Sequence, residues 1–222
     1  KRLTQYGYTF LLEMGDRKIY DDYVASKQIY SEARQSFSKA LVIGKHALRI
    51  IYPEVDQWLS NPEQIKINFE IQHIPNLYWT AASIGGLIKS GKGSPETVVL
   101  FPLVGLLLNT ALELDPSWGN GSIYTALISY TMAEFQVSKA KKEKVKFYFE
   151  EAVRLSNGTD AGTFVAYAES VSIKNQDKNE FIQLLNKAVA ITSTDDEEIN
   201  LQNIIARNRA KWLLSRTDEL FY

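Results

Sequence analysis

Apolar residues recur along most of the chain at the three- and four-residue spacing of an amphipathic α-helix. One short motif within this pattern is repeated. In it an alanine is followed directly by a large apolar residue, and a second apolar residue stands two positions after the first. Its three copies are Thr110–Leu114, Glu151–Leu155 and Lys187–Ile191. A fourth, Ser38–Leu41, lies upstream. Small residues at these positions predict sites where two helices cross closely, because a large side chain there would hold them apart.

The interval between the copies suggests stacked helix pairs. Ala111, Ala152 and Ala188 are 41 and 36 residues apart, near the roughly 34-residue period of tetratricopeptide helix-turn-helix repeats. We therefore predict an all-α chain of about four degenerate tetratricopeptide-like repeats in one domain, 1–222. Residues 1–75 would hold N-terminal helices with a degenerate first repeat, and residues 76–222 the clearer repeats.

Capping signals and apolar periodicity together predict the helix boundaries. Asp177 to Glu180 and Thr194 to Glu197 have the spacing of a capping box, and Ser94-Pro95 is a typical helix start. No period-two alternation bounded by hairpin turns is found. The predicted helices span residues 3–14, 22–52, 54–60, 62–72, 76–90, 95–114, 120–135, 139–156, 161–173, 178–191 and 196–219.

Composition excludes several classes of protein. The chain has 222 residues, 45% of them hydrophobic and 23% charged, as in a globular protein with a sizeable core. Its 25 basic and 26 acidic residues give no overall attraction to nucleic acid or to an anionic membrane. The absence of cysteine excludes disulfides, thiol catalysis and cysteine-based metal sites. Because the sequence opens at Lys1 without methionine, we expect that an N-terminal segment has been removed.

The longest apolar run, Val98–Leu108, is eleven residues long and contains Pro102 and Gly105. A membrane-spanning helix needs about 20 residues. We therefore expect this run to form part of a helix that is buried on most sides.

Motifs that resemble catalytic sites are incomplete. Gly86–Gly93 matches the phosphate-binding loop except at its last position, where Gly93 replaces the Ser or Thr that binds magnesium, and a helix rather than a strand is expected before it. Ala81–Gly85 resembles a nucleophile elbow, but His46 and His73 both lie upstream, opposite to the order in that class of hydrolase. Neither histidine has a second ligand at i+4. We predict a protein that is not an enzyme, with no cofactor and no metal site.

Two other patterns have more than one interpretation. Asn120-Gly121-Ser122 and Asn157-Gly158-Thr159 are glycosylation sequons, but each fits better as a turn between helices. A cluster of lysines lies at the start of one predicted helix, where cations oppose the helix dipole. It is either a solvated face or a patch that contacts an acidic partner or lipid headgroups. Its members are Lys139, Lys141, Lys142, Lys144 and Lys146.

Several longer runs together resemble the TatT family, a component associated with TRAP transporters. In the first half these are Tyr78–Ser83, Ala111–Pro116 and Gly119–Gly121. The second half contributes Tyr148–Val153, Val165–Glu169 and the ending Asn208–Phe221. The likeness covers roughly residues 35 to 222, and the combination of the Tyr-Trp motif with the Arg-Ala-Lys-Trp-Leu ending is its most specific part.

The resemblance implies a periplasmic lipoprotein with tetratricopeptide-like repeats that works beside the substrate-binding subunit of a sodium-coupled importer of organic acids. It implies an accessory binding subunit rather than an enzyme, a homotrimer, and an internal hydrophobic channel. The membrane would be reached only through an acylated N-terminal cysteine that this sequence lacks, and nucleic acid is not an expected partner. The alternative is a generic repeat scaffold that holds a peptide or protein segment in its concave groove.

Aromatic and cationic residues on the expected inner helices are the candidates for binding a hydrophobic carboxylate. An aromatic surface can hold an apolar ligand, and a guanidinium binds a carboxylate bidentately. The competing interpretation is core packing for the aromatic residues and an ion pair with a glutamate for Arg209. The candidate ligand-binding residues are Trp79, Ser83, Trp118, Tyr124, Tyr167 and Arg209.

Overall fold

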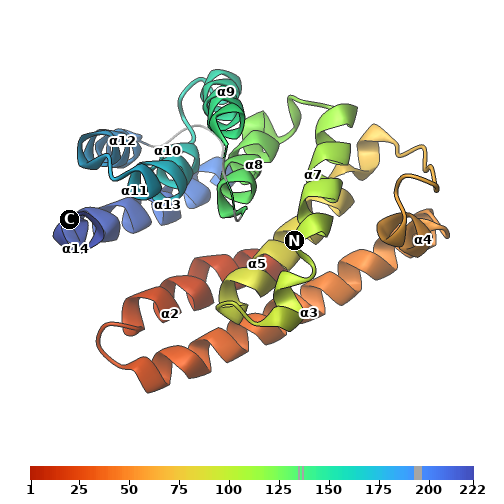
Figure 1. The fold of residues 1–222 in the computed structure, drawn as a ribbon, viewed down its shortest axis with the longest axis horizontal. Coiled ribbons are helices and arrows are strands. Elements are labelled where there is room, and N and C mark those ends of the chain that lie inside the picture. Colours follow the sequence, from red (N-terminus) through yellow and green to blue (C-terminus); the bar gives the residue numbers. More distant parts are fainter. Residues whose placement is uncertain (135, 137, 193–196) are drawn as a thin grey trace. The chain divides into compact units, whose positions relative to one another are not determined.

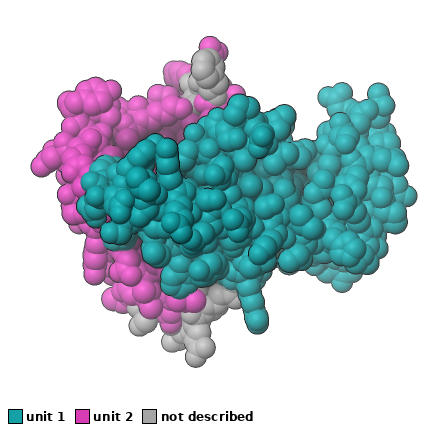
Figure 2. Space-filling model, turned by 90° about the horizontal axis from the view of Figure 1, so that it is seen from below, with its two compact units in different colours: residues 1–115 teal, residues 116–222 magenta. Residues whose placement is uncertain are grey.

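A computed structural model describes residues 1–134, 136, 138–192 and 197–222, and within these ranges the chain is built of helices and turns without any strand. The predicted all-α class is confirmed (Figure 1). The chain forms two compact units, residues 1–115 and 116–222, which Figure 2 colours separately. The single-domain organisation and the tetratricopeptide character of the repeats remain predictions.

Unit 1 begins with one helical run in which a π-helical turn is inserted. The run consists of α1 (Arg2–Tyr6), the π-helix η1 (Gly7–Leu12) and α2 (Glu13–Lys18). It packs along α3 (Tyr23–Ile51), where the Asp22 carboxylate accepts a hydrogen bond from the Ala25 amide at 3.0 Å and so caps the helix. The first run, predicted over 3–14, and α3, predicted over 22–52, both begin and end within a few residues of these bounds.

The predicted helix over residues 62–72 is wrong. After α4 (Val55–Ser60), residues 61–64 form a turn and residues 65–70 are not helical. Side chains at 65, 67 and 69 are half-buried and those at 66, 68 and 70 are exposed. A helix would place alternate residues on nearly opposite faces, so burying every second residue requires extended backbone. The Phe69 ring anchors the segment, with ring centroids 4.7 Å from Tyr52 and 4.8 Å from Trp58.

The rest of unit 1 is formed by η2 (Ile71–His73), α5 (Ile74–Gly91), α6 (Pro95–Val98) and α7 (Phe101–Leu114). The helix predicted over 95–114 is interrupted at Val99-Leu100, because Pro102 lacks an N–H and its ring opposes the carbonyl four residues before. Among the described residues, Pro95–Leu114 is the one helical segment whose length and mean hydropathy of 1.9 would allow it to cross a membrane. Only 33% of the apolar stretch within Pro95–Leu114 is buried. The expectation that this helix is buried on most sides is therefore not met.

Unit 2 is formed by further helices with short turns. The Asp177 carboxylate accepts a hydrogen bond from the Glu180 amide at 2.9 Å, so this predicted helix start is confirmed. The second predicted capping box includes residues 194–196, which lie outside the described residues. The elements are η3 (Trp118–Gly121), α8 (Ser122–Ala133), α9 (Lys139–Leu155), α10 (Ala161–Tyr167), the π-helix η4 (Ala168–Ser172), α11 (Ile173–Asn175), α12 (Lys178–Ala190), α13 (Glu197–Ser215) and α14 (Thr217–Leu220).

The repeated alanines lie in the packed interiors of the two units. Ala111 belongs to unit 1, while Ala152 and Ala188 belong to unit 2, and each is exposed by 1% or less. Ala188 lies in a core with Phe181 and Leu185, which are both fully buried. Small residues therefore occupy buried positions where the sequence predicted close helix packing.

Gly121 permits a close approach to the backbone of α9, which makes it sensitive to substitution. Its φ is +93°, and a Cβ added to it would lie 2.9 Å from the Cα of Ala152. Replacing Gly121 by alanine is expected to lower the free energy of unfolding by about 2 kcal/mol, from left-handed backbone strain and from the clash. Urea denaturation would measure this. Gly158 is the matched control, since its φ is +69° but no atom lies within 4 Å of the added Cβ. Equal losses at both positions would contradict the role of close packing.

Candidate functional site

A groove of about 380 Å³ lies within unit 1, between α3, α5 and the start of α1. We call it the α3–α5 groove. Its lining is mostly apolar or small and includes two cations, both from the start of the chain. The lining residues are Lys1, Arg2, Leu3, Ala40, Ile43, Gly44, Ala47, Pro75, Asn76, Trp79, Thr80 and Ser83.

The groove exists because small residues on α3 face α5. Gly44 lies so close to α5 that a Cβ added to it would be 2.5 Å from the Thr80 hydroxyl oxygen. One turn to either side, Ala40 and Ala47 leave space that a larger side chain would fill. The close contact at Gly44 holds the two helices together, and the alanines beside it leave part of the space between them open.

Trp79 and Ile43 provide the large apolar surface of the groove. Ile43 is 60% exposed and the Trp79 ring is half-buried, so both can contact a ligand. The hydroxyl groups are already engaged within the protein. Ser83 Oγ donates to the Trp79 carbonyl at 2.7 Å and lies 2.8 Å from Thr4 Oγ1, with which it shares a hydrogen bond. Ser83 is 1% exposed, so its evident role is to join α1 to α5 beside the groove.

The charged residues that line the groove are both cations. Lys1 and Arg2 are exposed lining residues, and Lys1 Nζ lies 5.8 Å from the centroid of the Trp79 ring. No carboxylate is found among the described residues that line the groove. An apolar surface with cations beside it matches an amphipathic anion, whose tail leaves water while its charged group stays at the rim.

Two aromatic candidates of unit 2, Tyr124 and Tyr167, lie in packed clusters. Tyr124 is 6% exposed, and its ring centroid lies 5.7 Å from that of Tyr148. Tyr167 packs on Phe149 with ring centroids 4.5 Å apart. Burial raises the pKa of both Tyr124 and Tyr167 above the ordinary value, because the phenolate would be poorly solvated there. Trp118 is half-buried in η3.

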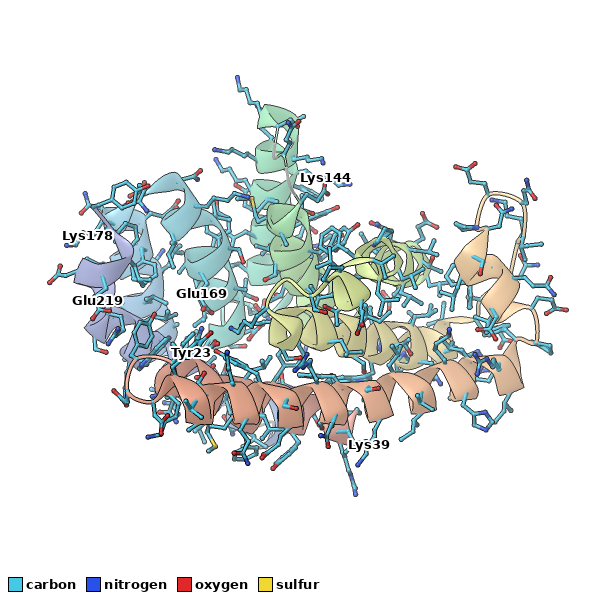
Figure 3. All side chains as sticks on the ribbon, turned by 60° about the horizontal axis from the view of Figure 1, so that its bottom comes forward. Tyr23, Lys39, Lys144, Glu169, Lys178 and Glu219 are labelled. Carbon is cyan, nitrogen blue, oxygen red and sulfur yellow. The ribbon has the colours of Figure 1, made fainter. Side chains whose placement is uncertain are left out.

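Arg209 is held in an ion pair inside unit 2. Its Nη2 lies 2.6 Å and its Nε 3.2 Å from Glu169 Oε1, and its guanidinium carbon lies 4.6 Å from the Trp212 ring centroid. The Arg209 side chain is 9% exposed and that of Glu169, which is labelled in Figure 3, is 27% exposed. This is the arginine–glutamate pairing that the sequence left open as the alternative to binding a ligand.

The structure therefore gathers only part of the predicted set in one place. Trp79 and Ser83 share the α3–α5 groove, while Tyr124, Tyr167 and Arg209 belong to packed parts of unit 2. A second, more open depression of about 460 Å³ in unit 2 is lined by Ser129, Met132, Ala133, Glu169, Ser170, Ile173 and Lys174, none of which was predicted.

Sequence reasoning missed Lys1, Arg2 and Ile43 as groove residues. Ile43 was placed on an amphipathic helix, where periodicity assigns an apolar residue to the core. The structure instead leaves it exposed at the edge of the groove. Lys1 and Arg2 carry no sequence signal that would distinguish them from other surface cations.

The incomplete catalytic motifs lie in ordinary structural positions. Residues 86–91 are the last part of α5, and Lys92 follows with a left-handed φ of 47° and pairs with Asp16 at 3.2 Å. His46 is exposed on α3, and His73 Nδ1 shares a hydrogen bond with the Tyr52 hydroxyl at 2.8 Å. Within the described ranges, no three His, Cys, Asp or Glu residues are gathered as a metal site.

The lysines of α9 mostly contact neighbouring side chains. Lys141 pairs with Glu134, Lys142 Nζ donates to the Asn175 side-chain oxygen at 2.8 Å, and Lys144 Nζ, labelled in Figure 3, lies 5.5 Å from the Tyr148 ring centroid. These contacts are those of an exposed face that also packs locally.

Comparisons with known proteins give one family and one relative. A family model described as TAtT, the TRAP transporter T-component, matches residues 1–221. A protein of Treponema pallidum (strain Nichols), described as uncharacterized, is 22% identical over 209 residues. That alignment covers 90% of this chain and 64% of the relative, so the chain spans less than two thirds of the relative's length.

Proposed function

The chain belongs to the TRAP transporter T-component family, and from this premise we propose that it is a non-enzymatic accessory subunit of a TRAP-type transporter. In this role it docks the substrate-binding subunit in the periplasm and holds a hydrophobic organic acid in the α3–α5 groove. The observation that carries the proposal is the combination in one groove of an apolar wall, formed by Trp79 and Ile43, with the cations Lys1 and Arg2.

A monocarboxylate with an alkyl or aromatic tail fits this arrangement. Its tail would cover Trp79 and Ile43, which removes apolar surface from water at about 25 cal/mol per Å². Its carboxylate would lie near Lys1 and Arg2 at the rim, where water still solvates all three charges. This placement avoids the cost of burying an ion.

The assembly that we propose is a homotrimer of lipid-anchored chains. It is supported by a line of exposed apolar side chains on the first helical run, at Tyr6, Phe10 and Met14, which are 49%, 55% and 50% exposed. The Tyr6 and Phe10 ring centroids lie 5.6 Å apart. A contiguous apolar stripe of this kind is typical of a surface that contacts another protein. Light scattering coupled to size exclusion would give the mass of the chain alone and with its substrate-binding subunit.

A second candidate function is a repeat scaffold that holds a peptide in the same groove. The open end of the groove and its length along α3 and α5 suit an extended apolar peptide as well as a fatty acid. The two functions differ in what the cations do, because a carboxylate needs them and an uncharged internal peptide segment does not.

Trp79→Ala tests the groove directly, with decanoate as the probe in isothermal titration calorimetry. We expect decanoate affinity to fall about tenfold or more, which is about 1.4 kcal/mol, because the largest apolar wall is lost. The free energy of unfolding should change by much less than the 3–5 kcal/mol typical of a buried tryptophan, because the Trp79 ring is half-exposed. Unchanged decanoate binding would exclude the groove as the site.

Arg2→Gln distinguishes binding of an organic acid from binding of an uncharged peptide segment. Decanoate should bind several-fold more weakly to this variant and decanol equally well, because only the acid carries a charge for the rim cations to attract. Arg17→Gln is the matched control, since Arg17 is an exposed cation of α2 outside the groove. Equal effects on decanoate and decanol would favour the peptide scaffold.

A further inference from the structure

Residues 65–70 form an extended segment that pairs with no other part of the described chain, and we call Ile65–Glu70 the edge segment. It follows α4 and leads into η2 in unit 1, in the orange-to-gold part of the ribbon in Figure 1. Glu70 has φ −100° and ψ 147°, which are ordinary β values. The alternation of half-buried 65, 67 and 69 with exposed 66, 68 and 70 is that of a strand lying on a protein surface.

One contact fixes which edge of this strand faces the protein. The Glu70 amide donates to the Tyr52 hydroxyl at 2.9 Å, and that hydroxyl also shares a hydrogen bond with His73 Nδ1. In an extended backbone, the amide and carbonyl groups of successive residues point to opposite edges. The backbone groups of Ile67 and Phe69 therefore point away from Tyr52.

That outer edge is unused. Within the described part of the chain, the backbone groups of Ile67 and Phe69 make no hydrogen bond. Two adjacent donors and two acceptors on an extended edge form a template onto which another strand can add. The nature of that strand follows from the side chains.

The edge segment is complementary to itself. The run Ile65-Lys66-Ile67-Asn68-Phe69-Glu70-Ile71 is chemically symmetric about Asn68, with the opposite charges of Lys66 and Glu70 two residues to either side. We propose that the edge segments of two copies of this chain pair antiparallel about Asn68. This inference goes beyond the function proposed above and does not depend on it.

In this register the unused backbone groups form hydrogen bonds and the opposite charges form pairs at the same time. Ile67 and Phe69 of one copy face Phe69 and Ile67 of the other and exchange four backbone hydrogen bonds. On the exposed face, Lys66 lies opposite Glu70 twice, and opposite charges at facing positions stabilise a sheet. Among the described residues, Lys66 Nζ makes one long 3.4 Å bond, to the Pro62 carbonyl, and Glu70 accepts from Gln72 at 2.7 Å, both on the exposed surface.

The apolar face gains as well. Ile71 is 61% exposed although it directly follows the strand. Because Ile71 begins η2, the paired segment ends at Glu70, and Ile71 lies just beyond it, near Ile65 of the second copy, which would cover part of it. Because such a pair has two-fold symmetry, it cannot build a trimer by itself and would instead join two trimers.

Single cysteines test the register, since these 222 residues contain none. Asn68 and its counterpart form a pair without backbone hydrogen bonds, where Cα atoms lie about 4.5 Å apart, within the range for a disulfide. Asn68→Cys should therefore give a disulfide-linked dimer under mild oxidation, at least about tenfold faster than Lys39→Cys. Lys39 is the control because it is exposed on the side of α3 away from α5 (Figure 3).

A mixed experiment separates antiparallel from parallel pairing. Lys66→Cys alone and Glu70→Cys alone should cross-link no faster than the Lys39→Cys control, whereas their mixture should form a heterodimer rapidly. Rapid cross-linking of each variant with itself would mean a parallel pair and would overturn the register. Cross-linking of Asn68→Cys at the control rate would overturn the pairing itself.

Charge reversal tests the same contact without cysteines. Lys66→Glu should weaken the two-fold association severalfold in analytical ultracentrifugation, and Lys66→Glu with Glu70→Lys should restore it. A double variant as weak as the single one would contradict the cross-strand pairs. Decanoate binding should be unchanged in all these variants, because the edge segment does not line the α3–α5 groove.

Discussion

Replacing Phe37 by alanine is expected to lower the free energy of unfolding by about 3–5 kcal/mol, because it empties a tightly enclosed site in the core of unit 1. Phe37 is fully buried, and its ring centroid lies 5.0 Å from that of Tyr8. Two glycines make room for its ring. A Cβ at Gly7 would lie 2.6 Å from the ring, and one at Gly86 would lie 2.3 Å from it. The three helical segments that meet here therefore have little freedom to collapse into the cavity.

Urea denaturation would measure the loss, with Val42→Ala as the matched control. Val42 lies on the same helix but is 64% exposed, so the same kind of truncation there should cost far less. A second test inverts the first. Gly86→Ala should destabilise by about 1–3 kcal/mol through overpacking, and Phe37→Leu should recover part of that loss. Purely additive effects would mean that the Phe37 ring and Gly86 do not share one space.

Glu169→Ala is expected to lower the free energy of unfolding by about 3 kcal/mol, because it leaves the buried Arg209 guanidinium without its carboxylate. The Nη2 to Oε1 distance is 2.6 Å, and the Arg209 side chain is only 9% exposed, so its guanidinium is largely shielded from water. The value is near the lower end of the range for buried pairs because the Glu169 side chain is 27% exposed.

Glu151→Ala is the matched control for burial. Glu151 and Arg154 also lie 2.6 Å apart in unit 2, but the Arg154 side chain is 64% exposed. Water and salt screen this surface pair, so its removal should cost far less than removal of Glu169. If both variants lost the same stability, burial would not distinguish the two pairs. If Glu169→Ala were harmless while decanoate bound more tightly, Arg209 would instead be a site for a ligand carboxylate.

The α3–α5 groove and the edge segment give unit 1 two separate surfaces. The groove presents an apolar wall with cations and suits a small amphipathic acid. The edge segment presents backbone groups and suits another strand. Because their residues do not overlap, variants at one surface leave the other intact, and the two proposals succeed or fail independently.

The sequence by itself determined the helical class, most helix boundaries and the buried positions of the repeated alanines, because periodicity and capping are local properties of the backbone. Asp22 and Asp177 cap their helices with hydrogen bonds that span only three residues. The same local information identified the family, since the motifs that carry the resemblance are short runs.

Only the tertiary structure decided the features that depend on contacts between distant residues. Residues 65–70 became extended because Phe69 packs on Tyr52 and Trp58, and because the Glu70 amide bonds to Tyr52. Arg209 was committed to Glu169, 40 residues away, whereas its sequence context had also left a ligand carboxylate open as a partner. Ile43 was left exposed beside Trp79, because helix packing selects which apolar face is covered. Such choices follow from the partner that each side chain meets in space, which local periodicity does not specify.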